Sequence, residues 1–290
     1  MDLLQIGLIG HPLGHTMSPL IHRELFALSG KAYRYRVLDI PDISGHLESL
    51  RLLDGFNVTI PYKRQIISFL DELDPQAAAY GSVNTVQCGQ GRMKGYTTDG
   101  LGCLRAVEDQ GLGVQGNLLI LGGGGAARAL AFTLGMLPSV NSLTLACREQ
   151  GREKAMGIQR ALTAYLEETG AVCRLAVLDY KTLEEGNAQY DLLLNATSVG
   201  MSPYPGISPV SKGVLRRCGG VFDAVYNPTE TLLLKQAKGL GIPTVGGMGM
   251  LVYQAAAAHE IWYGAAFPEA QIRGIVETAV RAMGERDTHQ

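Results

Sequence analysis

Residues 119–129 read LILGGGGAARA, and the rest of the chain is organised around this stretch. Leu118 to Leu121 is a short apolar run of the kind that forms a buried parallel strand, and it ends at four consecutive glycines. Helix-forming residues follow at once, from Ala126 to Leu137. A strand, a glycine turn and a helix in this order predict an α/β protein with a doubly wound sheet.

The glycines in this turn have the spacing of a ligand-binding motif. Gly122, Gly124 and Ala127 form a GxGxxA version of the dinucleotide fingerprint. Glycines tolerate positive φ and let a backbone approach a ligand closely, and the N–H groups at a helix start attract a pyrophosphate. The alternative is a glycine-rich turn without a ligand. The strand before the turn and the helix after it are the context that the motif requires, so we predict a dinucleotide site.

The composition limits the class of protein. The chain has 290 residues, 46% of them hydrophobic and 18% charged, with a formal net charge of -2. This length suits two domains, and without a basic cluster we expect a small-molecule ligand and no nucleic acid. The five cysteines are scattered and show no metal-ligand spacing, so we expect reduced thiols in the cytoplasm and no metal. No apolar run is long enough to span a membrane, so no membrane partner is expected.

Two hydroxyl side chains lie in the loop that follows the first predicted strand, residues 5–10. Thr16 and Ser18 are two residues apart and can converge on one ligand. The alternative for Ser18 is a helix N-cap, because Pro19 and the helical pattern of residues 20–28 come directly after it. Capping accounts for Ser18 but not for Thr16.

The stretch GFNVTIPYK, residues 55–63, predicts a strand with polar side chains near its end. Asn57 and Thr59 alternate with apolar residues, so in an extended segment both side chains point to one face. Lys63 lies just beyond the proline that ends the strand. An amide, a hydroxyl and an ammonium on one face suit a polyhydroxylated acid. The alternative for Lys63 is an ordinary solvated lysine that opens a helix over residues 65–70.

A second polar cluster comprises GSVNT, residues 81–85, and GYTTDGLG, residues 95–102. An isolated aspartate in a glycine-rich turn, such as Asp99, is usually a turn former. A lysine and an aspartate in one cleft are different, because the carboxylate holds the ammonium and the pair can relay a proton. Sequence spacing does not show whether Lys63 and Asp99 meet.

Residues 142–146 are the predicted second strand of the dinucleotide unit. The residues that follow this strand decide between NAD and NADP. An arginine there accommodates a 2′-phosphate, whereas an acidic residue binds a free 2′-hydroxyl and repels the phosphate. Arg148 and Arg152 supply the first signal and Glu149 the second. NADP and NAD both stay open at this point.

The remaining pattern predicts further elements of an α/β fold. We expect strands over residues 33–37, 172–178, 190–194 and 221–225, and helices over residues 43–53, 104–110, 152–169 and 270–283. A further helix, rich in small residues, begins at the GGMGMLVYQ stretch, residues 246–254. Because the sheet of the second half looks complete by about residue 226, we expect the C-terminal helices to pack back on the N-terminal half.

Eight motifs now carry a resemblance to a known family. They are HPLGHTMSPLIH, GFNVTIPYK, GSVNT, TTDGLG, LGGGGAARA, NATSVGM, DAVYNPTETLLL and GMGMLVYQA, in that order. In order and spacing they are similar to those of the shikimate dehydrogenase family, including its quinate/shikimate branch, over nearly the whole chain. The resemblance implies reduction of 3-dehydroshikimate to shikimate with a nicotinamide cofactor, a step towards chorismate and the aromatic amino acids.

The resemblance also implies roles for particular residues. Lys63 and Asp99 match the catalytic pair that handles the hydroxyl proton while hydride passes between the nicotinamide and the ring carbon. A lysine side chain is a cation at neutral pH, so it can polarise a carbonyl and then donate a proton. The positions matching substrate-binding residues are Thr16, Ser18, Asn57, Thr59, Lys63, Asn84, Asp99, Tyr226 and Gln254. Those matching cofactor-binding residues are Gly122, Gly124, Gly125, Ala126, Arg148, Glu149, Arg152, Asn195, Thr197, Met201, Gly247 and Met250.

This sequence departs from the family pattern at four places. Thr16 replaces one of the usual pair of serines and adds a methyl group where the substrate carboxylate should lie. The family usually has the sequence NTD at the second place, and Thr97 replaces its asparagine. Where the family usually has the sequence NRT, this chain has Cys147, Arg148 and Glu149. The change removes two polar partners of a 2′-phosphate and adds an anion. The helix that follows is longer than in the smallest members of the family. The catalytic pair is intact, but the substrate and cofactor preferences are open.

The resemblance implies two α/β domains. We expect residues 1–103 to form a substrate-binding domain, residues 104–240 a Rossmann-like NAD(P) domain, and residues 241–290 helices that return to the first domain. The favoured reading is a cytoplasmic shikimate dehydrogenase that uses NADP. The alternatives are a quinate/shikimate dehydrogenase that uses NAD, a sensor that binds shikimate or quinate without catalysis, and an unrelated Rossmann protein. A homodimer is one of the assemblies that the sequence leaves open.

Overall fold

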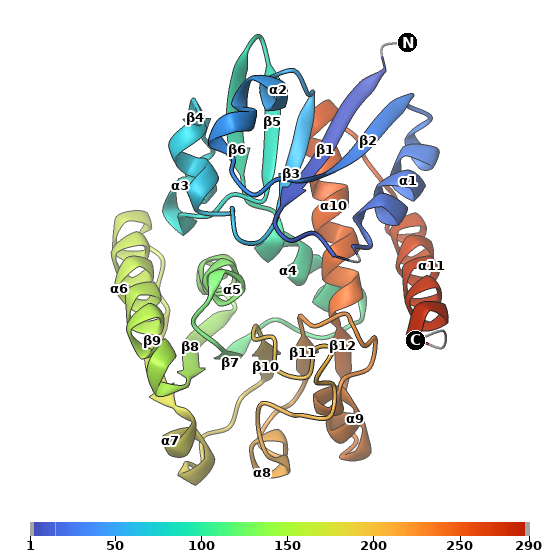
Figure 1. Ribbon diagram of the computed structural model, residues 1–290. Coiled ribbons are helices and arrows are strands. Elements are labelled where there is room, and N and C mark those ends of the chain that lie inside the picture. Colours follow the sequence, from blue (N-terminus) through green and yellow to red (C-terminus); the bar gives the residue numbers. More distant parts are fainter. Residues whose placement is uncertain (1–2, 15, 288–290) are drawn as a thin grey trace. The chain divides into compact units, whose positions relative to one another are not determined.

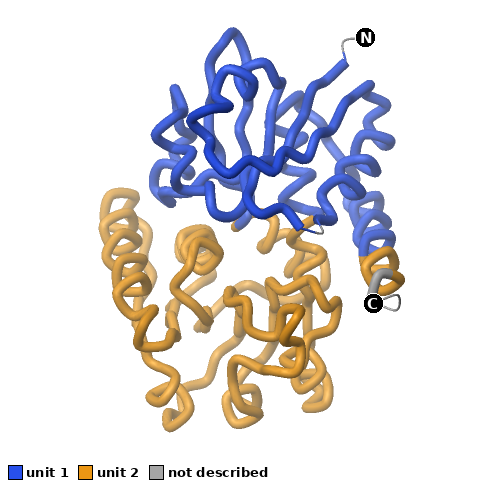
Figure 2. The backbone as a smooth tube through the Cα atoms, viewed as in Figure 1, with its two compact units in different colours: residues 1–99, 252–279 blue, residues 100–251, 280–290 orange. Residues whose placement is uncertain are grey.

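The computed structural model describes residues 3–14 and 16–287 and divides the chain into two compact units. Unit 1 comprises residues 1–99 and 252–279, and unit 2 comprises residues 100–251 and 280–290 (Figure 2). His15, in the loop between the first strand and the first helix, is outside the described residues. Within the described ranges, each unit contains a six-stranded sheet.

The sheet of unit 1 is mixed, with the strand order β2-β1-β3-β5-β6-β4 (Figure 1). Its strands are β1 (Leu4–Gly10), β2 (Tyr33–Asp39), β3 (Gly55–Val58), β4 (Glu72–Leu73), β5 (Thr85–Gly89) and β6 (Arg92–Tyr96). The first three are parallel, and β5 is antiparallel to both β3 and β6. The turn between β5 and β6 is short, as expected for a hairpin. The polar residues that follow β3 and those that follow β6 lie just beyond the ends of two strands of this sheet.

Helices and turns cover the sheet of unit 1. They are α1 (Ser18–Ser29), η1 (Ser44–His46), α2 (Leu47–Arg51), η2 (Gln65–Phe69), α3 (Pro75–Tyr80), and parts of α10 (Gly247–Tyr263) and α11 (Glu269–Asp287). Ile6, Phe26, Ala258 and Trp262 pack together, so α10 closes one part of the core with β1 and α1. The Trp262 Nε1–H donates to the Val86 carbonyl at 2.9 Å, which attaches α10 to β5 as well.

The sheet of unit 2 is wholly parallel, with the order β12-β11-β10-β7-β8-β9. Its strands are β7 (Gly116–Leu121), β8 (Val140–Cys147), β9 (Arg174–Asp179), β10 (Leu192–Asn195), β11 (Val221–Asp223) and β12 (Thr244–Gly246). Counted from β7, this is the 3-2-1-4-5-6 order of the dinucleotide-binding fold, which confirms the predicted doubly wound sheet. The order reverses between β7 and β10, where such sheets bind their ligands.

Helices cover the sheet of unit 2. They are α4 (Asp99–Asp109, whose first residue belongs to unit 1), α5 (Gly125–Gly135), η3 (Glu149–Gly151), α6 (Arg152–Thr169), α7 (Tyr180–Glu185), α8 (Lys212–Leu215) and α9 (Leu232–Gly239). Leu119, Leu121 and Leu193 of the central strands pack with Leu233 and Leu234 of α9. In the described part of the chain, no helix is both long enough and apolar enough to cross a bilayer.

Four local predictions need correction. Residues 43–53 form a 3₁₀ turn and a short helix rather than one helix, and residues 65–69 are 3₁₀-helical. The sheet of unit 2 is not complete by residue 226, because β12 adds a strand that is too short to show a periodic pattern. Ser18 is not the N-cap of α1: it is the first helical residue, and Met17 holds the cap position without a side-chain hydrogen bond.

The prediction that α4 begins near residue 104 is also wrong, because the helix starts at Asp99. Two glycines in this first part, Gly100 and Gly102, disfavour a helix in isolation. Gly100 is required by packing, because a Cβ there would lie 1.8 Å from the Thr133 Oγ1 atom of α5. The early start makes Asp99 a helix N-terminal residue rather than a turn former, and its carboxylate complements the positive end of the helix dipole.

Candidate active site

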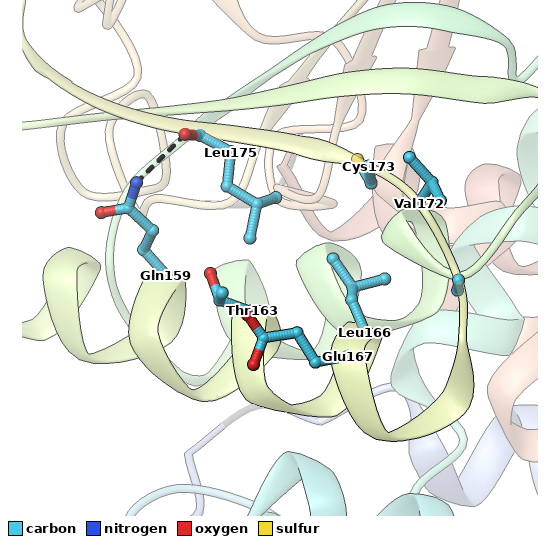
Figure 3. A pocket seen from close by; sticks show the side chains of 8 residues that line it. Gln159, Thr163, Leu166, Glu167, Val172, Cys173 and Leu175 are labelled. Atoms are coloured by element: carbon cyan, nitrogen blue, oxygen red, sulfur yellow. Dashed lines mark hydrogen bonds between the residues drawn. The ribbon is translucent and has the colours of Figure 1, made fainter.

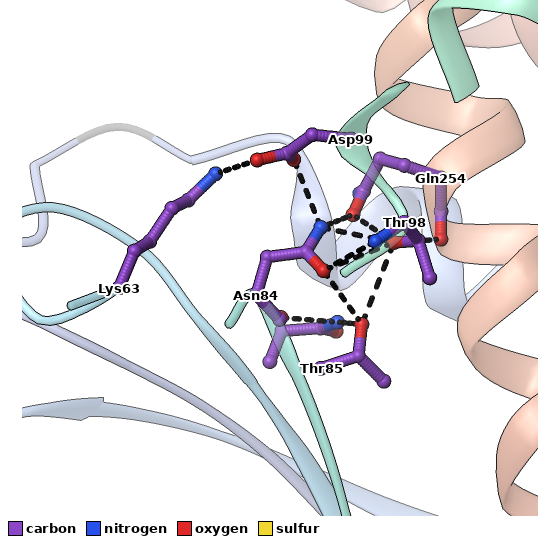
Figure 4. Close-up of polar contacts among 7 residues, drawn as sticks. Lys63, Asn84, Thr85, Thr98, Asp99 and Gln254 are labelled. Carbon is purple, nitrogen blue, oxygen red and sulfur yellow. Dashed lines mark hydrogen bonds and ion pairs between the residues drawn. The ribbon is translucent and has the colours of Figure 1, made fainter. Parts of the chain in front are cut away.

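Unit 1 contains an ion pair between Lys63 and Asp99. Lys63 lies in the turn between β3 and η2, and Asp99 follows β6 as the first residue of α4. The Lys63 Nζ atom is 2.6 Å from the Asp99 Oδ2 atom (Figure 4). The Lys63 side chain is 28% exposed and that of Asp99 10%, so the ammonium can reach a ligand while the carboxylate is largely covered. The two residues that spacing alone did not connect are therefore in contact.

Asn84 holds the second oxygen of Asp99. The Asn84 Nδ2 atom donates to Asp99 Oδ1 at 2.8 Å and to Gln254 Oε1 at 3.1 Å (Figure 4). Its Oδ1 atom accepts from the Thr98 backbone N–H at 2.8 Å. A backbone N–H only donates, so this bond assigns the two ends of the amide. Asn84 is 2% exposed, and its orientation fixes Asp99 from the side opposite Lys63.

Thr98 and Thr85 complete this polar cluster, although neither was predicted from the sequence as a site residue. The Thr98 Oγ1 atom donates to the Gln254 carbonyl at 3.0 Å, which attaches the cluster to α10. The Thr85 Oγ1 atom lies 3.3 Å from both the Asn57 Nδ2 and the Asn84 Oδ1 atoms. Both threonines are buried, and each is the sequence neighbour of a predicted site residue in the motifs GSVNT and TTDGLG. This neighbourhood in the sequence could have identified them.

The other predicted substrate residues are spread over the two units. The Thr16 Oγ1 atom donates to the Ser18 hydroxyl at 3.1 Å and accepts the Ser18 backbone N–H at the same distance, so these two hydroxyls do converge. Asn57 is buried at 6% exposure, and Thr59 is half-buried beyond the end of β3. Tyr226 belongs to unit 2, where it follows β11, and burial raises the pKa of its phenol.

Unit 2 contains a pocket of about 680 Å³ at the carboxyl ends of β7, β8 and β10. This is the edge at which the strand order reverses, so the pocket lies where a doubly wound sheet binds a ligand. Four of the predicted cofactor residues line it: Gly122, Gly124, Arg148 and Thr197. Lining residues that the sequence analysis did not assign include Gly151, Lys154, Tyr180, Ser198 and Ser208.

The glycine turn is tightly packed at two positions. Gly122 has φ +113°, and a Cβ there would lie 3.1 Å from the Thr197 Cγ2 atom and 3.3 Å from the Ala196 carbonyl oxygen. A Cβ on Gly123 would lie 3.1 Å from the Gly151 carbonyl oxygen. Gly124 occupies the N-cap of α5 without a side-chain hydrogen bond, so the first N–H groups of α5 have no side-chain cap. Such a helix start binds anions.

The residues predicted to choose the cofactor lie around the start of α6. Arg148 follows β8 in extended conformation and lines the pocket with Tyr180, whose raised pKa reflects burial that the Arg148 charge partly offsets. Glu149 begins η3, and Arg152 is the first residue of α6. Arg148 therefore lies at the pocket, and Glu149 and Arg152 lie beside it in the chain.

A buried carboxylate supports the wall of this pocket. Asp223, at the end of β11, has no exposed surface, and burial raises its pKa despite the hydrogen bonds it accepts. Its Oδ1 atom accepts from Asn195 Nδ2 at 2.9 Å, and its Oδ2 atom from Thr231 Oγ1 at 2.6 Å. The Asn195 Oδ1 atom in turn accepts the Thr197 hydroxyl at 2.7 Å and the Thr197 backbone N–H at 3.1 Å. Asn195 therefore acts on the pocket indirectly, because it holds Thr197, which lines it.

The remaining predicted cofactor residues lie outside the pocket lining. Gly125 and Ala126 form the first turn of α5. Met201 is 44% exposed, and Met250 lies in the first turn of α10. Gly247 begins α10, where a Cβ would lie 2.3 Å from the Ala224 carbonyl oxygen, so a glycine is required there for packing.

A second pocket of unit 2, about 330 Å³ in volume, lies between α6 and β9 (Figure 3). The Gln159 Nε2 atom donates to the Leu175 carbonyl at 3.1 Å and ties the helix to the strand. Val172 and Cys173 border this pocket at the amino end of β9. Ligands of doubly wound sheets bind at the carboxyl ends of the strands, so this pocket is not part of the candidate site.

Comparison with known proteins identifies close relatives. Residues 8–86 match the family model described as the shikimate dehydrogenase substrate binding domain. A protein of Methanococcus maripaludis strain C6 named shikimate dehydrogenase (NADP(+)) is 38% identical over 267 residues, which cover 89% of this chain and 91% of that protein.

Solved structures agree in fold over almost their full length. The shikimate 5-dehydrogenase of Thermus thermophilus, in complex with NADP(H) and shikimate, has a TM-score of 0.83 at 30% identity and covers 95% of this chain and 99% of its own. The shikimate 5-dehydrogenase of Listeria monocytogenes, in complex with shikimate and NAD, has a TM-score of 0.83 at 32% identity and covers 94% and 96%.

Proposed function

The chain belongs to the shikimate dehydrogenase family, and from this premise we propose that it catalyses the reversible NADPH-dependent reduction of 3-dehydroshikimate to shikimate. The enzyme is then an oxidoreductase acting on a CH–OH group, in the route to chorismate and the aromatic amino acids. The observation that carries the proposal is the contact of 2.6 Å between Lys63 and Asp99, with Asn84 holding the carboxylate from the other side.

The ion pair suits general acid–base chemistry. When bound, NADPH supplies the hydride that reduces the ring carbonyl carbon. The Lys63 ammonium lies within reach of solvent and can donate a proton to the oxygen that becomes a hydroxyl. Asp99 keeps the ammonium in place, and in the oxidative direction the same pair accepts the proton. Asn84, which also donates to Gln254, limits the movement of Asp99, so the proton donor is held in position before substrate binds.

The residues that match the family's substrate positions are proposed to bind the substrate. Thr16 and Ser18 present two hydroxyls at the start of α1, which suits a carboxylate. Asn57, Thr59, Asn84, Tyr226 and Gln254 are proposed to bind the ring hydroxyls. In this assignment residues 1–103 form the substrate domain, and the helices of residues 241–290 return to it.

The pocket of unit 2 fits a dinucleotide phosphate. The Gly122 turn admits a close backbone approach, and the uncapped start of α5 offers N–H groups to a pyrophosphate. We assign the pyrophosphate to Gly122, Gly124, Gly125 and Ala126, and a 2′-phosphate to Arg148 and Arg152. Asn195, Thr197, Met201, Gly247 and Met250 are proposed to lie beside the nicotinamide half. Residues 104–240 are then the cofactor domain.

A second candidate differs in cofactor and substrate. Glu149 adds an anion beside Arg148, which disfavours a 2′-phosphate and suits NAD. Thr16 adds a methyl group at the proposed carboxylate site. These two residues favour a quinate/shikimate dehydrogenase that uses NAD.

The experiment that tests the proposal is a steady-state oxidation assay with shikimate and quinate, each with NADP and NAD. The highest kcat/KM for shikimate with NADP supports the proposed function. Preference for NAD or turnover of quinate supports the second candidate. Absence of turnover in all four combinations, with shikimate binding retained, contradicts both and indicates a non-catalytic sensor.

The assembly and location are also proposals. We infer a cytoplasmic protein, in agreement with five free cysteines. A homodimer remains a prediction that sedimentation velocity checks directly, because a monomer and a dimer of this chain differ twofold in mass.

A further inference from the structure

Two neighbouring residues at the end of β2 contact two segments that carry proposed site residues. Asp39 is the last residue of β2, and Ile40 follows it. In unit 1, β2 and β3 lie on either side of β1 and run parallel to it, so the three strands end at the same edge of the sheet (Figure 1). The first segment is the loop that leads from β1 to Thr16 and Ser18, and the second is the turn after β3 that contains Lys63.

The Asp39 carboxylate binds the first segment. Its Oδ1 atom accepts from the His11 Nδ1 atom at 2.7 Å, and its Oδ2 atom accepts the Leu13 backbone N–H at 3.0 Å. These hydrogen bonds lower the pKa of the Asp39 carboxyl, so it is ionised at neutral pH. A carboxylate only accepts, which places a hydrogen of the His11 ring on Nδ1. Asp39 therefore holds the loop at a point just before Thr16.

The same loop is packed against the segment that follows β3. The His11 backbone N–H donates to the Ile60 carbonyl at 3.2 Å. A Cβ on Gly10 would lie 2.6 Å from the Leu13 Cδ2 atom and 2.6 Å from the Thr59 Cγ2 atom. Both side chains thus pack against the glycine, and a shift of the loop would disturb Thr59, a proposed substrate residue.

The Ile40 carbonyl binds the second segment. It accepts the Tyr62 hydroxyl at 2.6 Å, and Tyr62 is 3% exposed. The Tyr62 backbone N–H donates to the Thr59 carbonyl at 2.9 Å. The Lys63 carbonyl accepts the Val83 backbone N–H at 2.8 Å. The backbone of Lys63 is therefore held through the residue before it and through its own carbonyl.

Both segments are attached to one short stretch of backbone. Asp39 and Ile40 are consecutive, so their Cα atoms are about 3.8 Å apart. The Ile40 backbone N–H donates to the Gly10 carbonyl at 3.1 Å, which fixes this stretch to the end of β1. A movement of one segment relative to the other would break at least one of these contacts.

We propose that Asp39 and Tyr62 are positioning residues that set the separation between the proposed carboxylate site, Thr16 and Ser18, and the Lys63 ammonium. The inference rests on the proposed function for the identity of the substrate. A six-membered ring keeps the carboxylate and the reacting carbon of 3-dehydroshikimate at a nearly constant separation. A site of fixed dimensions accepts this acid and disfavours acids in which the two groups are closer together or farther apart.

The competing explanation is that both contacts only stabilise unit 1. The Asp39 side chain is 44% exposed, and a polar pair at such a position contributes little to stability. If stability were their only role, each variant would alter unfolding and neither would alter one kinetic parameter selectively. The positioning role requires separate effects, on substrate binding for Asp39 and on the chemical step for Tyr62.

The first experiment replaces Asp39. Asp39→Ala removes both contacts with the loop, and we expect the KM for shikimate to rise about five- to tenfold, with kcat and the KM for NADP nearly unchanged. Asp39→Asn retains an oxygen that can accept the Leu13 N–H and should restore part of the affinity. An unchanged KM for shikimate in a folded Asp39→Ala variant would overturn the proposal.

Asp71→Ala is the matched control for this substitution. Asp71 also accepts from one side chain, Arg51 at 2.6 Å, and from one backbone N–H, that of Met93 at 2.7 Å. None of these three residues belongs to the candidate site. We expect Asp71→Ala to lower stability and to leave the KM for shikimate unchanged. A similar rise of this KM in the Asp39 and Asp71 variants would count against a positioning role.

The second experiment removes the Tyr62 hydroxyl and keeps the ring. Without its contact to Ile40 the Lys63 ammonium is less well placed, so Tyr62→Phe should lower kcat about tenfold with little change in the KM for shikimate. Tyr263→Phe is the control, because it removes a hydroxyl that lies 2.6 Å from the His259 Nδ1 atom, outside the candidate site, and should leave kcat unchanged. A folded Tyr62→Phe variant with the kcat of the wild type would contradict the proposal.

The third experiment does not depend on the proposed function. Backbone hydrogen exchange should become faster at the His11 amide in Asp39→Ala and at the Val83 amide in Tyr62→Phe, each without the other. Unchanged exchange at both amides overturns the positioning role even if the enzyme oxidises shikimate. The expected exchange in a protein that neither binds nor oxidises shikimate would contradict the proposed function and reduce Asp39 and Tyr62 to structural anchors.

Discussion

Among the residues that the structure describes, Lys63 has one partner for its charge, and enough of its side chain is exposed to meet a second. Its Nζ atom contacts Asp99 Oδ2 at 2.6 Å, while more than a quarter of the side chain is exposed at 28%. A lysine that only stabilised the fold would gain little from this contact, because partly exposed ion pairs contribute about 0–1 kcal/mol. The geometry is more useful for proton transfer than for stability.

Replacement of Lys63 by alanine should therefore affect the chemical step. Loss of a positioned general acid typically costs about 10²- to 10⁴-fold in rate, so Lys63→Ala should lower kcat by that factor with a small change in the KM for shikimate. Steady-state kinetics at saturating NADP measure both parameters. Lys94→Ala is the matched control, because Lys94 also pairs with a carboxylate, Glu72, and lies outside the candidate site. A loss carried by KM alone would refute the catalytic role.

Arg148 permits a test of cofactor choice at the same scale. It lines the pocket of unit 2, and a charge-assisted hydrogen bond to a phosphate contributes about 1.5–3 kcal/mol. Arg148→Ala should raise the KM for NADP by about 10- to 100-fold and leave the KM for NAD nearly unchanged. Arg160→Ala, at an exposed position of α6 paired with Glu153, is the control. An unchanged ratio of the two KM values would show that Arg148 does not bind a 2′-phosphate.

The sequence predicts some site residues better than others, for physical reasons. Lys63 and Asp99 were assigned as the catalytic pair through the family resemblance, because residue type and spacing left their contact open and only the fold brings their atoms together. Asp39 and Leu13 are 26 residues apart, so no local pattern connects them. Asp223 was not predicted as a site residue, because it acts on Thr197 only through Asn195.

Helices and strands constrain one another most tightly where a glycine removes a side chain. Gly55 of β3 lies against the Trp262 indole of α10, and a Cβ there would be 2.3 Å from Nε1. That Nε1–H also donates to Val86 of β5, so the indole cannot shift without loss of a buried hydrogen bond. Three elements of unit 1 therefore meet at a single glycine.

Gly55→Ala should lower the free energy of unfolding by about 1–3 kcal/mol, the usual cost of overpacking a core. Trp262 is the only tryptophan of the chain, so its fluorescence during urea unfolding reports on unit 1. Gly274→Ala is the matched control, because Gly274 lies inside α11 with open space around its Cβ position, and it should stabilise by about 0.5–1 kcal/mol. Equal effects of the two substitutions would contradict the packing argument.

At the scale of elements, periodicity was reliable for long segments and weak for short ones. The helix predicted over residues 152–169 has the bounds of α6. In contrast, β12 has three residues, too few for a pattern, and the first turn of α4 contains Gly100, which its packing against α5 explains. Local propensity does not contain the tertiary contacts that override it.

The whole molecule should lose stability in mild acid because two of its histidines, His22 and His259, are buried. An unfolded histidine binds a proton near pH 6.5, whereas the pKa of His22 in the folded protein is about 3 and that of His259 is also lowered. Between these values the unfolded state binds more protons, so the stabilisation present above pH 6.5 is lost as the pH falls. The groups that face the two histidines, Tyr35 and Tyr263, have raised pKa values and do not titrate there.

Between pH 6 and pH 5, each histidine should contribute a slope of about 1.4 kcal/mol per pH unit. Urea unfolding followed by Trp262 fluorescence at several pH values measures this slope. His259→Phe should reduce it by about the share of one histidine, whatever its effect on stability at neutral pH. A variant with the wild-type slope would indicate that His259 is protonated in the folded protein.

The division of the chain has a consequence for its biosynthesis. Unit 1 takes residues 252–279 from beyond the whole central part of unit 2, and Trp262 and Ala258 complete a cluster with Ile6 and Phe26. A ribosome delivers the N-terminal segment first, at about 5–20 residues per second, and must translate all the intervening residues before α10 emerges. The nascent chain therefore carries an open apolar surface on β1 and α1 for most of its translation, and this surface is a natural target for ribosome-associated chaperones.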